Sequence, residues 1–553
     1  MDSDQREKME PKEEPKEETP RNSSSKGLTP TSMEERRALD DMDAENSMSK
    51  DRRDEHLSRT KSAVSIADTL SLPREIAFVS VICMANFMTQ AALGQVLSII
   101  HIIGDSFAIT DPGVLSWLIA GYSLTVGTFI LISGRLGDAF GHKRLLLIGF
   151  AWFSVWSMVC GLAVYSNHVL FVFARVLQGI GPAIALPNSL AILGVTYAPG
   201  KRKAMVFAIF GAMAPNGSIA GSLFAGIFGQ LAWWPWAFWA LAIVLAVITV
   251  LGYFAIPEPP KDALASMPLS QKIRELDLEG ATVGITALIL VNFAWNQAPI
   301  VGWDKAYIIV TLVLGIALMP VFFYIELRWA KHPLIPKECL TTTVGFVLAC
   351  TACGWACFGI WAYYIWQYIE IIRGIGPILA SAWISPVCVS GALAAIVTGW
   401  LLGKVRPGVV MCIALTFFTT GTIIIMTVPI HQTYWAQTFV GVSVIPWGMD
   451  MSFPAATLIL SNAVKKEHQG IAASLVNTVV NYSISLGLGF AGTVEVNVNH
   501  GGRNKKDLLS GYRGAWYVGC GLAGLGLGIS IVFLMRHILS DRRESSSNES
   551  ESE

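Results

Sequence analysis

Long stretches without a charged residue recur along this sequence, and they limit the folds that it can adopt. Residues 112–134 are 23 consecutive positions without Asp, Glu, Lys or Arg, and residues 145–174 are another 30. A helix of about 20 apolar residues is long enough to cross the hydrocarbon core of a bilayer. The composition, with 53% hydrophobic and 14% charged residues, also lies outside that of soluble domains. The sequence therefore predicts a polytopic membrane protein.

The apolar runs predict fourteen membrane-spanning helices. Two runs are too long for one span: residues 204–257 are divided by an aromatic turn at 230–236, and residues 407–464 by a turn near Pro429. Helices are favoured over a β-barrel because the runs are continuously apolar, and a bilayer admits only these two architectures. The runs that predict one span each are 76–104, 112–134, 145–174, 176–200, 280–303, 306–325, 339–369, 374–403, 468–494 and 514–535.

The loops on the two sides of the predicted membrane differ in their basic residues. An even number of spans places both chain ends on one side, and the loops of that side hold 16 Lys and Arg, against 6 in the opposite loops. Basic loops remain cytosolic. The sequence therefore predicts cytosolic termini and a multi-pass protein of the plasma membrane, with the vacuolar membrane as the alternative.

Polar segments divide the chain into six predicted parts. The first 74 residues are rich in Glu, Lys, Ser and Arg and nearly free of aromatic residues, so they cannot form a core and are predicted to be disordered. The expected parts are a disordered cytosolic N-terminal tail (1–74), an N-terminal six-span bundle (75–257), a cytosolic linker (258–279), two additional spans with a cytosolic loop (280–338), a C-terminal six-span bundle (339–539) and a disordered cytosolic C-terminal tail (540–553).

One polar motif, GRLGDAFGHKR at residues 134–144, lies between two of the most apolar runs. Its glycines allow a tight turn between packed helices, and its aspartate can face a helix N-terminus or an arginine. Such a polar clamp can hold one of two bundle arrangements and release it. A merely solvated turn would explain the basic residues but neither the three glycines nor the aspartate. The residues assigned to this conformational switch are Gly134, Arg135, Gly137, Asp138, Gly141, Lys143 and Arg144.

This motif resembles the signature of the loop between spans 2 and 3 of major facilitator superfamily transporters. Ala139 and His142 stand where the family usually has basic residues. A second stretch, RVLQGIGPA at residues 175–183, is similar to the family's span 4 pattern, with Arg175, Gln178, Gly179 and Gly181 in the matching positions. An arginine inside a membrane helix is energetically costly, so Arg175 is expected to face a cavity and to bind partners such as Gln178 or a carboxylate.

Span 5 resembles the antiporter signature of the family through Gly217, Gly221 and Gly226, although Ser222 stands where the family has proline. Fourteen spans and the Asp277-x-x-Gly280 sequence before span 7 resemble the 14-span drug:proton antiporter family, in its fungal aminotriazole-resistance and borate-export branch. The stretch GWLLGKVRPG at residues 399–408 looks like a second copy of the switch motif. The resemblance implies an all-α major facilitator fold, two six-helix bundles with two inserted spans.

Asp450 is the residue that we expect to bind protons, and Arg175 is assigned with it to proton coupling. Asp450 precedes Lys465 by 15 residues, which at ~1.5 Å per residue of helix is ~22 Å from the membrane edge. A carboxylate at mid-membrane is energetically unfavourable unless it has a function or a partner. The alternative is a fixed hydrogen bond that stabilises a kinked helix between Pro446 and Pro454. Three further acidic residues lie at span ends and are interpreted as interface residues: Glu326, Glu370 and Glu495.

Amide and aromatic side chains within the spans are candidates to line a central substrate cavity. Family members often carry an acidic residue in span 1, whereas this chain has Asn86 and Gln90, so proton coupling is not assigned to span 1. The predicted cavity residues are Asn86, Gln90, Trp117, Tyr122, Asn188, Trp361, Tyr364, Gln367, Trp447 and Asn481.

Neither a metal site nor a cofactor is predicted. Cys350, Cys353 and Cys357 share one helix face, but no His or carboxylate joins them, so they are interpreted as small packing residues. The soluble segments contain no phosphate-binding loop, which argues against ATP as the energy source. No residue is assigned a catalytic role, and the protein is not expected to be an enzyme.

These features predict proton-coupled efflux of small molecules, such as drugs, toxins or small polar solutes, by alternating access. The alternatives are a proton-coupled uptake transporter and a membrane nutrient sensor that uses the same fold without transport. The expected partners are a small-molecule substrate, protons and the lipid bilayer, with no nucleic acid, and the protein is expected to act as a monomer. The identity of the substrate does not follow from the sequence.

Overall fold

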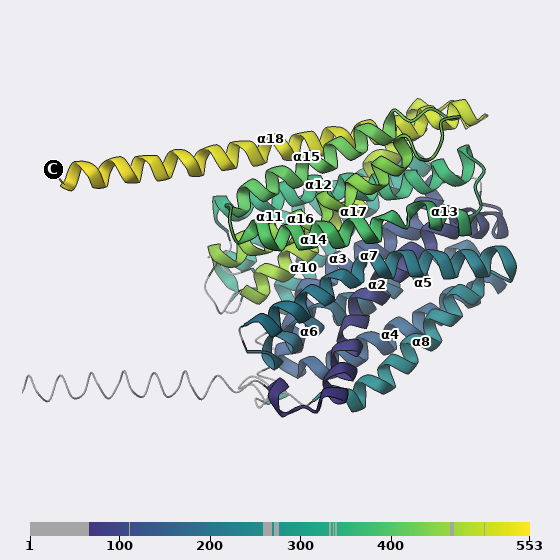
Figure 1. The fold of residues 1–553 in the computed structure, drawn as a ribbon. Helices are drawn as coiled ribbons and strands as arrows, with labels where there is room; N and C mark the ends of the chain where they lie inside the picture. Colours follow the sequence, from purple (N-terminus) through teal and green to yellow (C-terminus); the bar gives the residue numbers. More distant parts are fainter. Residues whose placement is uncertain are drawn as a thin grey trace, which may run out of the picture. The chain divides into compact units, whose positions relative to one another are not determined.

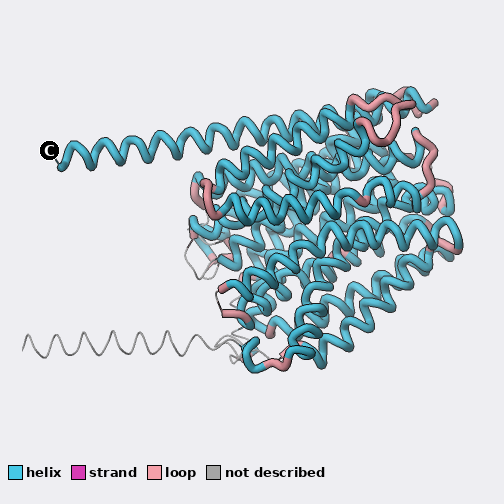
Figure 2. Tube along the Cα trace, viewed as in Figure 1, coloured by secondary structure: helices cyan, strands magenta, loops and turns pink. Residues whose placement is uncertain are grey.

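The computed structural model describes residues 66–552 except for 110, 199, 258–267, 270–271, 273–275, 331–332, 336, 338–339, 465–468 and 503. The predicted disordered N-terminal tail, up to residue 65, and most of the predicted linker at 258–279 lie outside the described residues. All regular structure among the described residues is helical, as predicted (Figure 2).

The first group of helices follows a short helical turn, η1 (Ile66–Thr69). Helices α5 and α6 follow each other directly and form one membrane-length segment, His168–Thr196. Neighbours in this group pack against one another, α2 with α7 and α4 with both α6 and α8 (Figure 1). The helices are α2 (Leu72–Ser106), α3 (Pro112–Phe140), α4 (His142–Leu162) with η2 (Ala163–Tyr165), α5 (His168–Gln178), α6 (Ile180–Thr196), α7 (Lys201–Leu231) and α8 (Pro235–Ala255).

Two helices precede the second group. They are α10 (Leu278–Val301) and α11 (Ala306–Tyr324), which continues into the π-helical turn η4 (Ile325–Trp329). Helix α10 packs on α3 and α17, whereas apolar side chains of α11 such as Ile309, Val310 and Val313 are exposed and suited to contact lipid. The second group is α12 (Thr342–Gln367) with η6 (Tyr368–Ile372), α13 (Pro377–Ile384), α14 (Pro386–Leu402), α15 (Pro407–Met426), α16 (Gln437–Ala463), α17 (Gln469–Val498) and α18 (Lys505–Ser552).

The helical segments reproduce the predicted layout. Within the described residues, 13 helices are long and apolar enough to cross a membrane by length and composition. The fourteenth predicted span corresponds to α16, which is 27 residues long and packs against α12, α14, α15 and α17. Asp450 and the two prolines inside this helix lower its hydropathy. The fold is therefore two six-helix bundles with two inserted helices.

The C-terminal segment differs from its prediction. Residues 540–553 were expected to be disordered, but α18 continues as one helix to Ser552. Extending an existing helix adds one backbone hydrogen bond per residue without a new nucleation step. A polar sequence that follows a membrane helix directly can therefore remain helical, and composition alone does not exclude this.

Small residues allow α2 and α7 to approach closely. A Cβ atom on Gly217 would overlap the backbone oxygen of Phe87, and a Cβ atom on Gly221 would overlap that of Ala91. In the bilayer, where lipid is as apolar as a leucine side chain, helices associate largely through such close packing. The glycines of the predicted span 5 motif therefore hold two helices of one bundle together, while Gly226 lies against Pro377 and Ile378 of the other bundle.

The two bundles contact each other along two seams. Helix α3 packs on α17, where the Ser485 hydroxyl donates a hydrogen bond to the Ala120 carbonyl at 2.8 Å. Helix α7 packs on α13 and α14, where the Gln230 side chain accepts a hydrogen bond from the Ile378 N–H at 3.2 Å. In each of these bonds a side chain of one bundle meets a backbone group of the other.

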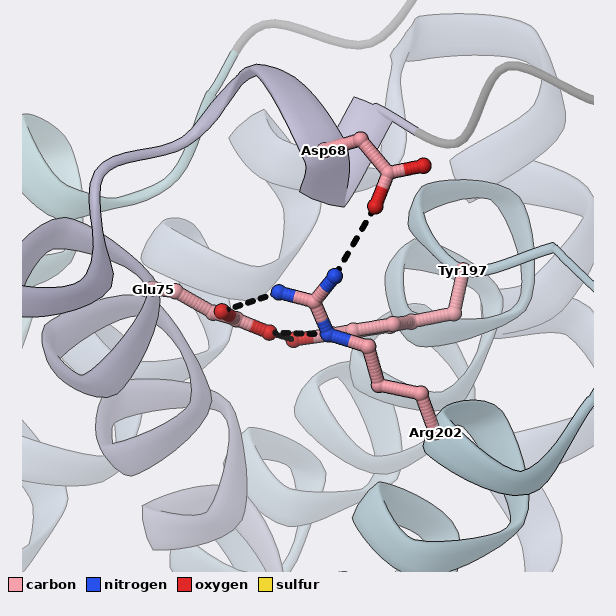
Figure 3. Close-up of polar contacts among 4 residues, drawn as sticks. All are labelled: Asp68, Glu75, Tyr197 and Arg202. Atoms are coloured by element: carbon pink, nitrogen blue, oxygen red, sulfur yellow. Dashed lines mark hydrogen bonds and ion pairs between the residues drawn. The ribbon is translucent and has the colours of Figure 1, made fainter.

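A charged cluster joins the beginnings of α2 and α7 (Figure 3). The Arg202 guanidinium donates to both carboxylate oxygens of Glu75, and its Nη1 donates to Asp68 of η1 at 2.9 Å. The Tyr197 hydroxyl donates to the same Glu75 carboxylate at 2.8 Å. Glu75 is nearly buried. The cluster therefore fixes the entry of the chain into the first membrane helix.

The glycine packing predicts opposite effects for two substitutions in α7. Gly221→Ala should destabilise the protein by about 1–3 kcal/mol, because the new Cβ atom must displace the backbone of α2. Gly211→Ala is the matched control, since no atom lies within 4 Å of a Cβ at Gly211. The control should be neutral or stabilising by up to about 1 kcal/mol through helix propensity. Thermal unfolding of both purified variants measures the difference, and equal midpoints would contradict this account.

Candidate functional site

The predicted switch motif is helical almost throughout. Helix α3 ends at Phe140 and α4 begins at His142, so Gly141 alone forms the turn, with φ of 96°. This conformation is unfavourable for residues other than glycine. A Cβ atom on Gly137 would overlap both the Asn188 side chain and the His142 ring. Two of the three glycines in the motif are therefore required by the turn and by close packing.

Three polar side chains connect this turn to α6. His142 Nε2 lies 3.3 Å from the Asp138 carboxylate, and His142 Nδ1 lies 2.8 Å from Asn188 Oδ1. Asn188 is fully buried and also donates to the carbonyls of Ser133 and Ile184. Asn188 was predicted to line the substrate cavity. The structure places its side chain in hydrogen bonds with the α3–α4 turn region and its own helix.

The basic residues of the motif reach other elements. Lys143 Nζ donates to the carbonyl of Ile256 at 2.7 Å, just after α8. Arg135 Nη2 donates to the carbonyl of Pro333, in the segment that follows the inserted helices. Arg144 is exposed. The turn is therefore bonded to α6, to the end of α8 and to the segment around Pro333, and a solvated turn does not need these bonds.

Arg175 lies fully buried in α5. Its Nε donates to the carbonyl of Leu118 at 2.9 Å, Nη1 donates to Gln178, and the guanidinium lies 4.4 Å from the centre of the Tyr122 ring. Gln178 in turn donates to the Ser157 hydroxyl at 2.7 Å. Arg175 thus contacts Gln178, the first of the two expected partners. Among the described residues, its hydrogen-bond partners include no carboxylate.

Tyr122 was predicted to line the cavity, but it is buried beneath the Arg175 guanidinium. Its hydroxyl donates to the carbonyl of Thr89 at 2.9 Å, which joins α3 to α2. A buried arginine next to an aromatic ring gains cation–π stabilisation. Arg175 Nη2 is buried and has no hydrogen-bond partner among the described residues. The Arg175 site therefore keeps one free donor inside an otherwise satisfied polar network.

Asp450 lies in α16 where the two bundles meet. A Cβ atom on Gly391 of α14 would lie 2.8 Å from Asp450 Oδ2 and 3.6 Å from Cγ of Pro215 in α7. Cys388 Sγ, one turn earlier in α14, lies 3.5 Å from the Pro215 carbonyl. No hydrogen bond to the Asp450 carboxylate is found among the described residues, so the alternative of a fixed structural hydrogen bond gains no support.

The interpretation of the span-end carboxylates as interface residues is wrong for two of them. Glu495 of α17 is 3% exposed and accepts a hydrogen bond from the Tyr364 hydroxyl of α12 at 2.7 Å. Glu326 of η4 is 1% exposed and accepts one from the Ile335 N–H. The sequence positions suggested contact with the interface because span ends usually do so. Burial there depends on neighbouring helices that the local sequence does not specify.

The remaining predicted cavity residues contact several different elements. Trp117 donates to Gln297 of α10 at 3.1 Å and packs on Phe293, so it faces an inserted helix. Trp447 donates to Ser390 of α14 within its own bundle. Two amide side chains bond backbone carbonyls: Asn86 bonds that of Phe210, and Asn481 bonds one in its own helix. Gln90 is half-buried. The remaining three, Trp361, Tyr364 and Gln367, are buried in α12.

Three observations now define the class of protein: membrane-length helices in two bundles, a polar turn that is bonded to several elements, and buried charged residues within the helices. The Major Facilitator Superfamily model matches residues 77–488. The chain belongs to the major facilitator superfamily, and it is a multi-pass membrane transporter of this type.

The relatives narrow the branch of this superfamily. A low affinity ammonium transporter of Saccharomyces cerevisiae is 53% identical over 476 residues, which cover 86% of this chain and 91% of the relative. Efflux pump terJ of Aspergillus terreus is 47% identical over 84% of this chain and 89% of its own. The aminotriazole resistance protein of Saccharomyces cerevisiae is 40% identical over 85% and 86%. The predicted relation to fungal drug transporters is confirmed.

Solved structures support the fold alone. A POT family transporter in complex with a thioalcohol-conjugated peptide has a TM-score of 0.62 and 15% sequence identity, over 83% of this chain and 95% of that one. At this identity the likeness extends to the arrangement of helices and not to the residues of the site.

The contacts of Asn188 predict a defect in conformational cycling. Asn188→Ala removes the bonds between the α3–α4 turn and α6, and we expect a folded protein with turnover reduced at least several-fold. Asn497→Ala is the control, because Asn497 is exposed and bonds only the Thr493 carbonyl of its own helix. Initial transport rates in vesicles, normalised to folded protein, measure the effect. Equal rates for both variants would show that the bonds of the turn do not limit cycling.

The surroundings of Arg175 predict that lysine cannot replace it. Arg175→Lys keeps the charge but loses the planar fork that serves Leu118 and Gln178 together. We expect at least a tenfold loss of transport and a lower unfolding temperature. A lysine variant with wild-type transport and stability would mean that a positive charge alone is sufficient at this position.

Proposed function

We propose that this protein exports small molecules in exchange for protons across the plasma membrane, with both chain ends in the cytosol. The exchange proceeds by alternating access, in which the two six-helix bundles expose a site between them first to one side and then to the other. The names of two relatives, an efflux pump and an aminotriazole resistance protein, support export. Asp450 and Arg175 are the proposed coupling residues.

The position of Asp450 is the observation that carries this proposal. Its carboxylate lies beside Gly391 of α14 and near Pro215 of α7, at a seam between the bundles. A neutral carboxylic acid is tolerated where apolar helix surfaces close on it, whereas an ionised one requires water or a cation. Movement of α7 relative to α14 changes the surroundings of Asp450. Proton binding and bundle arrangement are therefore expected to depend on each other.

Uptake of ammonium is the second candidate function. The relative with 53% identity is named a low affinity ammonium transporter. The same carboxylate could attract a small cation in place of a proton, because both neutralise it. The experiment must therefore determine both the direction of substrate transport and the ion to which transport is coupled.

The test uses the full chain reconstituted in vesicles with an imposed pH gradient and a panel of candidate substrates that includes methylammonium. Asp450→Asn removes the titratable group and retains its size. We expect this variant to exchange substrate down its own gradient and to lose pH-driven accumulation, so that the ratio of driven to passive transport falls to about one.

Asp304→Asn serves as the control, because the Asp304 side chain is 77% exposed in the loop before α11. This variant should retain the wild-type ratio. Wild-type accumulation by Asp450→Asn would overturn the assignment of Asp450 and direct attention to the buried Glu495. Accumulation of methylammonium without dependence on the pH gradient would favour the second candidate function.

A further inference from the structure

Two carboxylates meet where α10 begins beside the end of α11. Asp277 precedes α10, and its Oδ1 accepts a hydrogen bond from the Gly280 N–H at 3.1 Å. Glu326 is 1% exposed, and its Oε2 accepts one from the Ile335 N–H at 3.2 Å. The second oxygen of each group, Asp277 Oδ2 and Glu326 Oε1, is buried and has no donor within the part of the chain that the structure describes. Each carboxylate is therefore half satisfied.

These two oxygens lie beside the same glycine, Gly280. A Cβ atom on Gly280 would overlap Asp277 Oδ2 and would lie 2.9 Å from Glu326 Oε1. Both oxygens thus lie against the same position on α10, and the two carboxyl groups are neighbours. Ionised carboxylates only accept hydrogen bonds, so neither can satisfy the other while both are charged. Protonation of one group turns the contact into an O–H···O⁻ bond, which is short and strong.

The backbone conformation of Asp277 fixes the orientation of its carboxylate. Its φ of 43° and ψ of 58° place it in the left-handed region, which is uncommon for residues other than glycine. Asparagine and aspartate are tolerated there because their side chains bond the local backbone. Here that bond is the one from Gly280. Asp277 Oδ1 is thereby occupied, and Oδ2 is left to face Glu326.

The pair is connected to the switch motif through a short segment, residues 333–335. Ile335 is bonded to Glu326, and the Pro333 carbonyl accepts the hydrogen bond from Arg135 of the switch. Leu334 and Ile335 also line an apolar cavity of about 200 Å³ between α3, α10, α11 and α17. Release of Glu326 from Ile335 would therefore loosen the backbone that holds Arg135.

We propose that Asp277 and Glu326 bind one proton between them, and that this proton holds residues 333–335, and through Pro333 the Arg135 side chain, in the arrangement seen here. The proton comes from water and bonds one carboxylate oxygen, so no other reactant is needed. Its loss leaves two facing negative charges, which separate and release the segment.

Among the described charged residues near the pair, three point to solvent, Arg135 is partly buried, and Lys272 lies over the Phe140 ring at the end of α3. Glu279 on α10, Arg328 in η4 and Lys337 in the following segment are exposed. Arg135, which approaches from α3, donates to the Pro333 carbonyl. In the proposed antiport cycle protons enter the cytosol, so an acidified cytosol would restrain the switch. This consequence rests on the proposed function, whereas the binding of the proton does not.

The test measures proton binding in the full chain, purified in lipid nanodiscs, without substrate. Infrared difference spectra between acidic and alkaline pH report protonated carboxylic acids through their carbonyl stretch. We expect Glu326→Gln and Asp277→Asn each to remove one protonated carboxyl signal per protein. The double variant should remove no more than either single variant, because the pair shares one proton. Glu279→Gln, on the exposed side of the same helix, is the matched control and should leave the spectrum unchanged.

Hydrogen exchange of the Leu334 and Ile335 amides provides the structural readout. In the wild type the protection of the Ile335 amide should fall at least tenfold from acidic to alkaline pH, whereas in Glu326→Gln it should be independent of pH. Spectra that neither substitution alters, or losses that add in the double variant, would overturn the proposal. Since neither readout requires transport, a negative result in the Asp450→Asn experiment leaves this one intact.

Discussion

The absence of water in the bilayer core is the constraint on which this structure depends. Every backbone group in that region must be satisfied within the protein, and helices do this within one segment. Association of these helices then depends on how closely their backbones approach. Gly217 and Gly221 of α7 allow this approach to Phe87 and Ala91 of α2. Glycine positions, which have no side chain, thus allow close helix packing in the first bundle.

The same constraint explains how polar side chains are distributed. Arg175 is buried but is bonded to a carbonyl, an amide and an aromatic ring within one bundle. Its environment would move with the bundle as a rigid unit. Asp450 differs, because its neighbours belong to both bundles. In the proposed alternating access, movement at this seam would change the surroundings of Asp450, whereas the described partners of Arg175 stay within one bundle.

The α3–α4 turn connects these elements. It bonds α6 through Asn188, the end of α8 through Ile256 and the segment after the inserted helices through Pro333. The inserted helices therefore do more than add apolar surface, since they bring the Asp277 and Glu326 carboxylates within one segment of the switch. Because the turn is bonded to several elements, a movement of any one of these elements can change the conformation of the turn.

Much of this architecture could be predicted from the sequence. Runs of apolar residues determine where helices cross the membrane, because the thickness of the bilayer sets the length of a span. The switch motif and the glycines of α7 also followed from local residue types, since a tight turn and close packing each require glycine. Even the more polar α16 was found, because its flanking turns divide an otherwise overlong run.

Only the tertiary structure decided which side chains meet. Asn188 was predicted to line a cavity, and the structure shows its bond to His142, while Trp117 faces an inserted helix. Glu326 and Glu495 lie at span ends, yet neighbouring helices bury both. The periodicity of a helix gives the face on which a residue lies but not the partner of that face. The partner of a side chain comes from contacts between segments that are distant in the chain. Asn292 and Ser485, for example, are hydrogen-bonded although 193 positions separate them. No local sequence pattern encodes such contacts.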